Sequence, residues 1–234
     1  EELRARVKSL ISMKANYDHA ISSEIAFLHA QIKPHFLHNV LNTLSHLTVE
    51  DPGKAERLVE NFSVYLRNNF EFYDLESMIP LEKELETIDA YIAIEKQRFG
   101  DRIQYECHVE ESIQGQNIGQ ILIPPLILQP LIENSVRHGI SKKIGGGKVT
   151  LDISQSPEGI TFTVTDDGVG MPEDVVKQVM AGQKSGSVGI RNINTRLRRT
   201  YGTSLECQSR EGQETRISFT IRKEQYDAAS NHRG

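Results

Sequence analysis

His35 is the first residue whose surroundings suggest chemistry, because it follows Pro34 directly within a run of helical spacing, Gln31–Asn42. Proline removes one N–H from a helix and biases the preceding residue away from helical geometry, so we expect the helix to kink or restart here. That break opens the backbone beside a neutral imidazole, which is a competent nucleophile at pH 7. His35 is therefore a candidate phosphoryl acceptor, and a plain surface histidine at a helix start is the alternative.

Asp166 is the second candidate, because it ends the alternating strand pattern Ile160–Asp166 on the face that carries the apolar residues. A carboxylate on the inward face of a strand costs several kcal/mol unless a donor satisfies it. Gly168 and Gly170 follow and would let a ligand or a backbone segment approach closely. The exocyclic amino group of adenine would suit Asp166 as the donor, and a hairpin turn with a capping aspartate is the alternative.

A third candidate is the stretch Gln129–Gly139, which reads as a helix with two pairs of residues four positions apart, each pair on a shared face. The pairs are Glu133 with Arg137 and Asn134 with His138. Asn134 offers a neutral oxygen suited to a Mg²⁺ ion that takes its other ligands from water and phosphates. Arg137 and His138 are candidates to face those phosphates. The alternative is a solvated helix face with an ion pair.

The glycine-rich stretch Gly182–Gly189 is the fourth candidate, and it leads into a helix that begins Ile190-Arg191-Asn192. Free N–H groups at a helix N-terminus attract an anion, and glycines allow a loop to wrap around phosphates. The spacing matches neither a Walker A loop nor a GxGxxG motif. We expect a phosphate-binding loop, and a mobile linker is the alternative.

These candidates need elements to position them, and the N-terminal part is predicted to be helical. Apolar spacing from Leu3 to Ile32 follows a coiled-coil pattern with one stutter. So narrow a stripe is not stable alone, so the segment needs a partner helix. A parallel homodimer is the simplest partner, and packing against the chain's own domain is the alternative.

Two further helices are expected before residue 100. Asp51-Pro52 supplies an N-cap and a first-turn proline for a helix that continues to Phe70. With the His35 helix it would form a helical hairpin, and two hairpins in a dimer would make a four-helix bundle with His35 outside its core. A third helical pattern, Leu81–Phe99, reads as the connector to a second domain.

From Arg102 onward the apolar period changes to two. Strands are expected at 103–109, 149–153, 160–166 and 217–221, with helices around 125–138, 173–181 and 190–201. Helices on one face of a mixed sheet make a two-layer α/β sandwich, so the fold class is α+β. The expected domains are 1–100, helical and dimerising, and 101–223, the sandwich, followed by a frayed tail at 224–234.

Composition excludes several classes of function. The chain has 234 residues and a formal charge of −5, which gives no basic footprint for nucleic acid. Cys107 and Cys207 show no metal-ligand spacing and are expected to be reduced core residues. The longest apolar run, Ile121–Ile132, is interrupted by prolines and is too short for a bilayer. With no signal peptide at Glu1, we expect a soluble cytoplasmic fragment of something longer.

Together and in this order, these stretches resemble the sensor histidine kinases of the LytS/YesM type over nearly the whole chain. The motifs that carry the resemblance are Gln31–Asn42, Leu128–Gly139, Asp166–Gly170, and Gly186–Asn192 with Arg196. The resemblance implies a Bergerat-type (GHKL) ATP-binding domain that uses ATP and Mg²⁺. It also implies autophosphorylation of His35 and relay to an aspartate in the receiver domain of a response regulator.

The resemblance associates Asn134 with Mg²⁺ and Asp166 with adenine, and its glycines frame an ATP lid. It also implies a homodimer, no nucleic-acid partner, and a membrane connection only through an upstream sensor segment. The predicted site residues are, for catalysis, His35, Glu133, Arg137 and His138; for ATP, Asn134, Asp166, Gly168, Gly170, Gly186, Gly189, Arg191 and Asn192; and for the metal, Asn134.

The sequence departs from the family pattern at three positions. His38 stands where the family usually has phenylalanine, Lys33 where it has asparagine, and Ser187 where the lid has a further glycine. His38 is therefore a rival acceptor, and His35 is preferred because the resemblance aligns it after the proline. Asn39 resembles the position where some histidine kinases orient a water for dephosphorylation, and a capping or solvent-facing asparagine is the alternative.

Two other functions fit parts of the pattern. An ATP-hydrolysing GHKL clamp would pass the phosphoryl group to water, but such enzymes place a basic carboxylate one turn before the asparagine, where this chain has Pro130. A degenerate scaffold would bind nucleotide only for shape. Phosphate bound to the protein after incubation with ATP would indicate a kinase, and free phosphate without labelled protein would indicate a clamp. ATP binding without labelling would indicate a scaffold.

Overall fold

The computed structural model describes residues 34–71, 78–114, 118–183 and 188–222. The chain divides into two compact units, Glu1–Ala55 and Glu56–Gly234. The expected coiled coil and the tail at 224–234 lie outside the described residues, as do Lys33, Gly186 and Ser187. Within the described ranges, no helix combines the length and the apolar character needed to cross a bilayer.

The first unit contains helix α2, Pro34–Glu50, and the start of helix α3, Pro52–Glu71. Pro34 is the first residue of α2 that the structure describes. Asp51 starts α3, since its Oδ1 accepts a hydrogen bond from the N–H of Lys54 at 3.0 Å. The predicted helix start at Asp51-Pro52 is confirmed.

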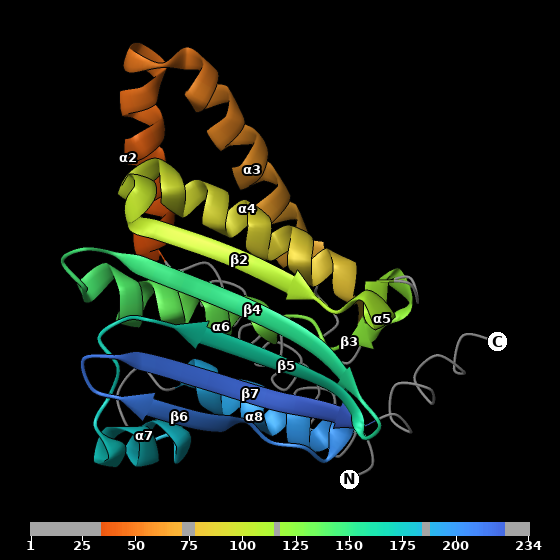
Figure 1. Ribbon diagram of the computed structural model, residues 1–234. Coiled ribbons are helices and arrows are strands. Elements are labelled where there is room, and N and C mark those ends of the chain that lie inside the picture. The colour runs from red at the N-terminus through yellow and green to blue at the C-terminus, as the bar shows by residue number, and fades with distance from the viewer. Residues whose placement is uncertain (1–33, 72–77, 115–117, 184–187, 223–234) are drawn as a thin grey trace, which may run out of the picture. The chain divides into compact units, whose positions relative to one another are not determined.

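The second unit is a mixed sheet with helices, drawn in Figure 1. Its helices are the rest of α3, α4 (Leu81–Phe99), α5 (Glu111–Gln114), α6 (Leu128–Asn134), α7 (Glu173–Met180) and α8 (Val188–Tyr201), with a π-helical segment, η3 (Ser135–Gly139), and three short 3-10 turns, η1 (Gly100–Arg102), η2 (Ile118–Gln120) and η4 (Ile140–Lys142). Its strands are β1 (Ile79–Pro80), β2 (Ile103–Val109), β3 (Leu122–Ile123), β4 (Gly147–Ser156), β5 (Gly159–Asp166), β6 (Glu206–Arg210) and β7 (Glu214–Arg222).

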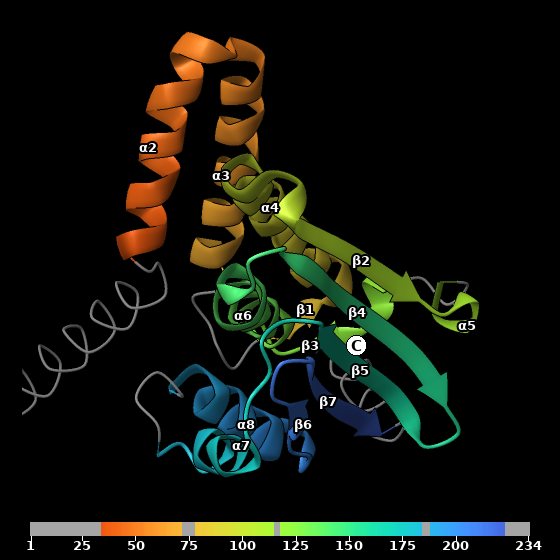
Figure 2. The ribbon, with the colours of Figure 1, turned by 60° about the vertical axis from the view of Figure 1, so that its left-hand side comes forward.

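The main sheet has the strand order β2-β4-β5-β7-β6. Strand β2 runs parallel to β4, and the other neighbours are antiparallel. Helices α6, α7 and α8 lie on one face of this sheet, as Figure 2 shows. The predicted two-layer α/β sandwich is therefore confirmed. Helix α4, which the sequence suggested as a connector, packs on α6 and β2 within the second unit.

The sheet faces follow the predicted alternation. Along β5, the buried face carries Ile160, Phe162, Val164 and Asp166, with exposed fractions of 1–3%. Phe162 stacks on Phe219 of β7, with ring centroids 4.9 Å apart. This burial drives the helices onto the inner face, at roughly 25 cal/mol for each Å² of apolar surface removed from water.

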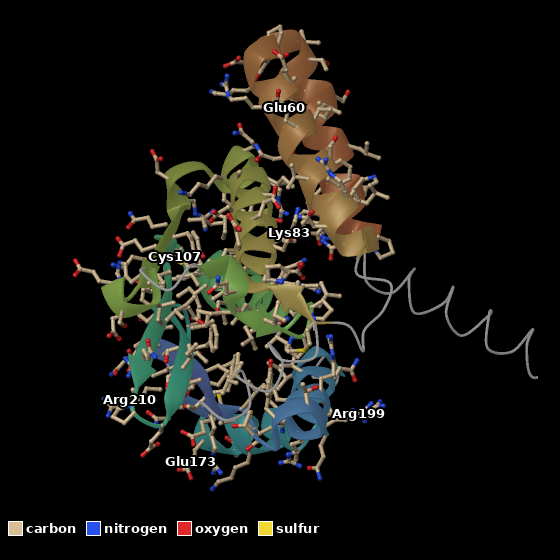
Figure 3. The ribbon with its side chains drawn as sticks, turned by 90° about the vertical axis from the view of Figure 1, so that its right-hand side faces the viewer. Glu60, Lys83, Cys107, Glu173, Arg199 and Arg210 are labelled. Atoms are coloured by element: carbon tan, nitrogen blue, oxygen red, sulfur yellow. The ribbon has the colours of Figure 1, made fainter. Side chains whose placement is uncertain are left out.

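The prediction that both cysteines are reduced residues of the core is wrong for Cys107. Both cysteines are free, but Cys107 is exposed, because β2 is an edge strand with a solvent-facing margin (Figure 3). Cys207 in β6 is partly buried, and burial raises the pKa of its thiol to about 11. A thiol that is protonated at neutral pH is a poor nucleophile, so Cys207 acts as a packing residue.

Candidate functional site

A cavity of about 430 Å³ lies in the second unit, between the inner face of the sheet and its helices. Its volume falls in the range that holds a small organic ligand. The wall is mostly apolar and comes from α7, α8 and the ends of β6 and β7. The polar side chains that line it are those of Asn134, Ser135, His138, Lys142, Asp166 and Thr215.

The stretch that contributes most of these polar groups changes its helical geometry where it meets the cavity. Leu128–Asn134 is α-helical, and Ser135–Gly139 continues as a π-helix. A π turn has more residues than an α turn and is frequently found at functional sites. Asn134 and His138 both line the cavity, whereas Arg137 is exposed and lies outside the lining. Asn134 and His138, four residues apart, therefore both face the cavity.

Helix α6 is capped by a side chain from another element. Glu84 of α4 is fully buried, and its carboxylate accepts hydrogen bonds from the N–H groups of Leu126, Leu128 and Gln129 at 2.8, 3.0 and 3.0 Å. Burial raises the pKa of Glu84, while these donors and the charge of Arg196 oppose the rise. The cap fixes the start of the helix that delivers Asn134 to the cavity.

Asp166 is the buried acid of the cavity, with 3% of its surface exposed. Its Oδ1 accepts a hydrogen bond from the N–H of Gly168 at 3.1 Å. Burial raises the pKa of Asp166 to about 6, and hydrogen bonds from Ser135 and Gly168 work against that rise. Asp166 is therefore mostly ionised at pH 7 and is able to accept a hydrogen bond from a ligand inside an otherwise apolar pocket.

Two glycines allow this carboxylate to sit where it does. A Cβ placed on Gly139 would collide with Oδ1 of Asp166, and a Cβ on Gly168 would collide with the backbone of Gly139. The N–H of Val169 also donates to the carbonyl of Gly139 at 3.4 Å. The close approach of the loop after β5 to the π-helical segment therefore requires both residues to lack side chains.

Glu133 lies beside Asn134 in sequence but faces a different environment. It is 7% exposed, does not line the cavity, and its Oε1 accepts hydrogen bonds from Tyr65 Oη at 3.2 Å and Gln129 Nε2 at 3.0 Å. Burial, followed by the charge of Glu133, raises the pKa of Tyr65 well above its ordinary value. The carboxylate thus joins α6 to α3.

The predicted lid residues are only partly placed. Gly189, Arg191 and Asn192 all belong to α8, are exposed and lie outside the cavity lining. Gly170 does line the cavity, and its φ of +61° explains the choice of glycine there. The structure thus brings Asn134, His138, Asp166 and Gly170 together.

Lys142 and Thr215 line the cavity but were not identified from the sequence. Lys142 stands in the 3-10 turn beyond the π segment, four residues after His138 and eight after Asn134, so extending the four-residue spacing past Gly139 would have found it. Thr215 pairs with Asp166 across the sheet, and its Oγ1 lies 2.9 Å from Oγ of Ser209. The alternation that placed Ile217 inward contained the signal for Thr215, which lies two residues away on the same face.

His35 lies in the first unit, exposed on α2. Its Nδ1 is 3.1 Å from Nδ2 of Asn39. His38 is exposed as well, and its Nδ1 is 3.1 Å from Nδ2 of Asn42. The two histidines therefore have equivalent local partners, and this local geometry does not choose between them.

Two family models match the chain. One, described as "Histidine kinase", matches residues 23–103, and the other, described as "Histidine kinase-, DNA gyrase B-, and HSP90-like ATPase", matches residues 123–225. The second match contains all of the polar residues that line the cavity.

Several curated proteins are similar to this chain over most of its length. The protein YwpD of Bacillus subtilis (strain 168) is 39% identical, over 94% of this chain and 77% of its own length. Sensor histidine kinase YpdA of Escherichia coli (strain K12) is 35% identical, over 90% of this chain and 36% of its own. Sensor protein LytS of Bacillus anthracis is 35% identical, over 86% of this chain and 34% of its own. The chain thus spans about a third of the length of YpdA and LytS.

Proposed function

This chain belongs to the histidine kinase family, the autokinases of two-component systems, and from that premise we propose that it transfers the γ-phosphoryl group of ATP to His35. The observation that carries the proposal is the buried, ionisable Asp166 in a mostly apolar cavity of about 430 Å³, which is within the size range of small-molecule sites. A purine would supply a further donor to this carboxylate from inside the cavity, through its exocyclic amino group.

ATP binding follows from membership of the GHKL ATPase group, and the residue assignments are part of our proposal. The adenine amino group donates to Asp166. Asn134 offers its side-chain oxygen to a Mg²⁺ ion, whose other ligands would be water and phosphate oxygens. The ion would offset the negative charge of the triphosphate. Lys142 and His138, which line the same cavity, are placed to attract the phosphates.

The proposed reaction is an in-line displacement. An imidazole nitrogen of His35 forms a bond to the γ-phosphorus, the bond from that phosphorus to the bridging oxygen breaks, and the electron pair leaves with ADP. Positioning and charge stabilisation supply most of the acceleration in such transfers. An aspartate in the receiver domain of a response regulator then takes the phosphoryl group from the histidine.

Two parts of the proposal concern organisation. Residues 1–100 form the phosphoacceptor part, which dimerises, and 101–223 form the ATP-binding part. Family membership supports a dimer and a response-regulator partner. That the chain is the cytoplasmic part of a membrane-bound sensor stays a prediction.

Labelling separates this proposal from its alternatives. Incubation of the chain with γ-labelled ATP and Mg²⁺ is expected to give protein phosphate that is labile in acid and stable in alkali. Free phosphate without labelled protein would instead indicate an ATPase clamp, and ATP binding without either product would indicate a scaffold. The structure offers little to the clamp, because Pro130 lacks a carboxylate and Glu133 is hydrogen-bonded outside the cavity lining.

Replacing Gly139 with alanine is expected to weaken ATP binding about tenfold, because the new Cβ would displace the carboxylate of Asp166 from its position. Isothermal titration with ATP measures this. Gly145→Ala is the matched control, since no atom lies within 4 Å of a Cβ built there. Wild-type affinity in Gly139→Ala would contradict the role of this contact.

ATP affinity is expected to fall as the pH is lowered through 6. Burial raises the pKa of Asp166 to about 6, so the carboxylate becomes protonated there and loses accepting strength. Because the pKa of Asp166 is raised in the folded state, the carboxyl group binds its proton more tightly there than in the unfolded chain. The free energy of unfolding of the ligand-free unit therefore falls as the pH rises through 6. The ligand binds the ionised form, which is the main form above that pH. Affinity at pH 5 should be about tenfold lower than at pH 7.

The titration is compared between the wild-type chain and Asp166→Asn, which removes this ionisation. ATP's own phosphates titrate equally in both, so the difference between the two pH profiles isolates Asp166. Parallel profiles for wild type and variant would show that Asp166 does not control the pH dependence.

A further inference from the structure

The helix that carries Asn134 is held from behind by a buried tyrosine. Oη of Tyr65, in α3, donates to Oε1 of Glu133, the residue before Asn134 in α6, at 3.2 Å. Asn134 lines the cavity, whereas Glu133 does not. We infer that Tyr65 is a positioning residue of the ATP site, which holds α6 through Glu133 and so aims Asn134 at the metal ion; this rests on the proposed function.

Helical geometry links these two neighbouring side chains. Successive residues of an α-helix point about 100° apart, so Glu133 and Asn134 turn together whenever α6 rotates about its axis. Side-chain atoms lie about 5–6 Å from that axis, so a rotation of about 10° moves the side-chain oxygen of Asn134 by about 1 Å. Mg²⁺ tolerates little displacement, because its ligands must lie about 2.0–2.1 Å away in a nearly octahedral arrangement. The aim of Asn134 therefore depends on what fixes the rotation of α6.

The contact lies at the end of α6 where the helical geometry changes. Asn134 is the last residue of the α-helical stretch, and the π-helical segment Ser135–Gly139 begins directly after it. The start of α6 is already fixed by the carboxylate of Glu84, which accepts from the N–H groups of Leu128 and Gln129. Tyr65 provides the second anchor, at the end next to the cavity, so the helix is held at both ends.

Tyr65 is itself held in place. Its ring centroid lies 6.3 Å from that of Tyr91 in α4, and its backbone carbonyl accepts a hydrogen bond from Nδ2 of Asn69 at 2.7 Å. Gln129, one turn before Glu133, donates to the same Oε1 at 3.0 Å. Burial, followed by the charge of Glu133, raises the pKa of Tyr65, so the phenol keeps its hydrogen and stays a donor at neutral pH. A fixed donor on a buried carboxylate leaves α6 little freedom to turn.

The first test compares ATP binding with and without Mg²⁺, by calorimetric titration of the full 234-residue chain. Tyr65→Phe keeps the ring and removes only the hydroxyl group. Its affinity for ATP in Mg²⁺ should be about 3- to 10-fold lower than that of the wild type, which is a change of about 0.7–1.4 kcal/mol and matches the net worth of one hydrogen bond. Its affinity in EDTA should change by less than about twofold, because Asp166 belongs to β5 and not to α6.

Tyr201→Phe is the matched control for this measurement. Oη of Tyr201, in α8, donates to the carbonyl of Leu122 at 3.0 Å, and this side chain is buried as well. The substitution therefore removes a buried phenol hydrogen bond from the same unit without touching Glu133. The ratio of the ATP affinities with and without Mg²⁺ should stay at its wild-type value in this variant.

The second test asks whether Tyr65 and Glu133 act as a pair. Glu133→Ala should lower the same ratio, and adding Tyr65→Phe to it should cause no further loss, because the contact is already gone. Glu133→Gln, whose amide oxygen still accepts from Tyr65, should keep the ratio and the rate of autophosphorylation within about twofold of the wild type. A general base would lose its function in Glu133→Gln, so this variant separates positioning from base catalysis.

A third measurement needs neither nucleotide nor metal. Amide hydrogen exchange in a peptide that covers residues 128–134, followed by mass spectrometry, should be faster in Tyr65→Phe than in the wild type. Exchange in the same peptide should be unchanged in Tyr201→Phe. Unchanged exchange in Tyr65→Phe would show that this tyrosine does not hold α6.

Several binding results would also overturn the inference. These are an unchanged affinity ratio in Tyr65→Phe, an equal change in Tyr201→Phe, equal losses with and without Mg²⁺, losses that multiply in the double variant, and a Glu133→Gln chain that behaves like Glu133→Ala. A wild-type chain whose affinity for ATP does not depend on Mg²⁺ would instead refute the metal assignment in the proposed function, and this inference with it.

Discussion

Replacing His35 with glutamine is expected to abolish the incorporation of γ-labelled phosphate into the chain while ATP binding is retained. Glutamine keeps polarity and approximate length but has no nucleophilic nitrogen, because its amide lone pair is delocalised. The loss should therefore be complete within the detection limit of the assay. Phosphoamino-acid mapping of the labelled wild-type chain and titration with ATP measure the two halves of the prediction.

His38→Gln is the matched control, since it removes the neighbouring imidazole that has the same kind of asparagine partner. Labelling is expected to survive in this variant. Because the local contacts of the two histidines are equivalent, this comparison decides the acceptor. Labelling that is lost in His38→Gln and kept in His35→Gln would show that the acceptor assignment is wrong.

Replacing Asp166 with asparagine is expected to lower the affinity for ATP by roughly 10- to 150-fold. Loss of a hydrogen bond to a charged group costs about 1.5–3 kcal/mol, and each 1.4 kcal/mol is a tenfold change in affinity. The effect should be large because Asp166 is 3% exposed, so water does not replace the lost partner. Calorimetric titration with ATP and with GTP measures it.

The pairing with adenine is what makes this test specific. GTP lacks the amino group at the position that donates to Asp166, so its weak affinity should hardly change in the variant. Asp174→Asn, an exposed acid on α7, controls for the loss of one negative charge and should bind ATP like the wild type. An equal loss for ATP and GTP would mean that the substitution damages the pocket generally and that Asp166 does not read the base.

The pattern of the sequence was sufficient to predict Asp166 and its surroundings. Period-two alternation places every second residue of β5 on one face, so the inward position of Asp166 follows from the apolar residues before it. The glycines after it then predict a close approach, and the structure shows that approach to Gly139. The helix start at Asp51 was predictable for a similar reason, because a cap depends only on residues within one turn.

The contacts that join distant segments were not predictable. Glu84 reads as an ordinary surface acid of a helix, yet it caps α6 from 42 to 45 residues away. Glu133 was assigned to catalysis by its place beside Asn134, but in the structure it bonds to Tyr65 and Gln129. Lys142 continues the four-residue spacing of Asn134 and His138, but it lies in a 3-10 turn beyond Gly139, where the predicted helix had ended. Cys107 fits an inward alternation, but the strand order puts β2 at the edge of the sheet.

The sequence by itself determined most of the longer helices and strands, the inward face of Asp166 and the family to which the chain belongs, because each of these depends on residue types at short, fixed spacings. Only the tertiary structure decided which side chains share the cavity and which carboxylates are used for packing. The physical reason is that burial and hydrogen-bond partners depend on which elements meet in space. A contact between residues 45 positions apart, such as that of Glu84 with Gln129, produces no repeating pattern in the sequence.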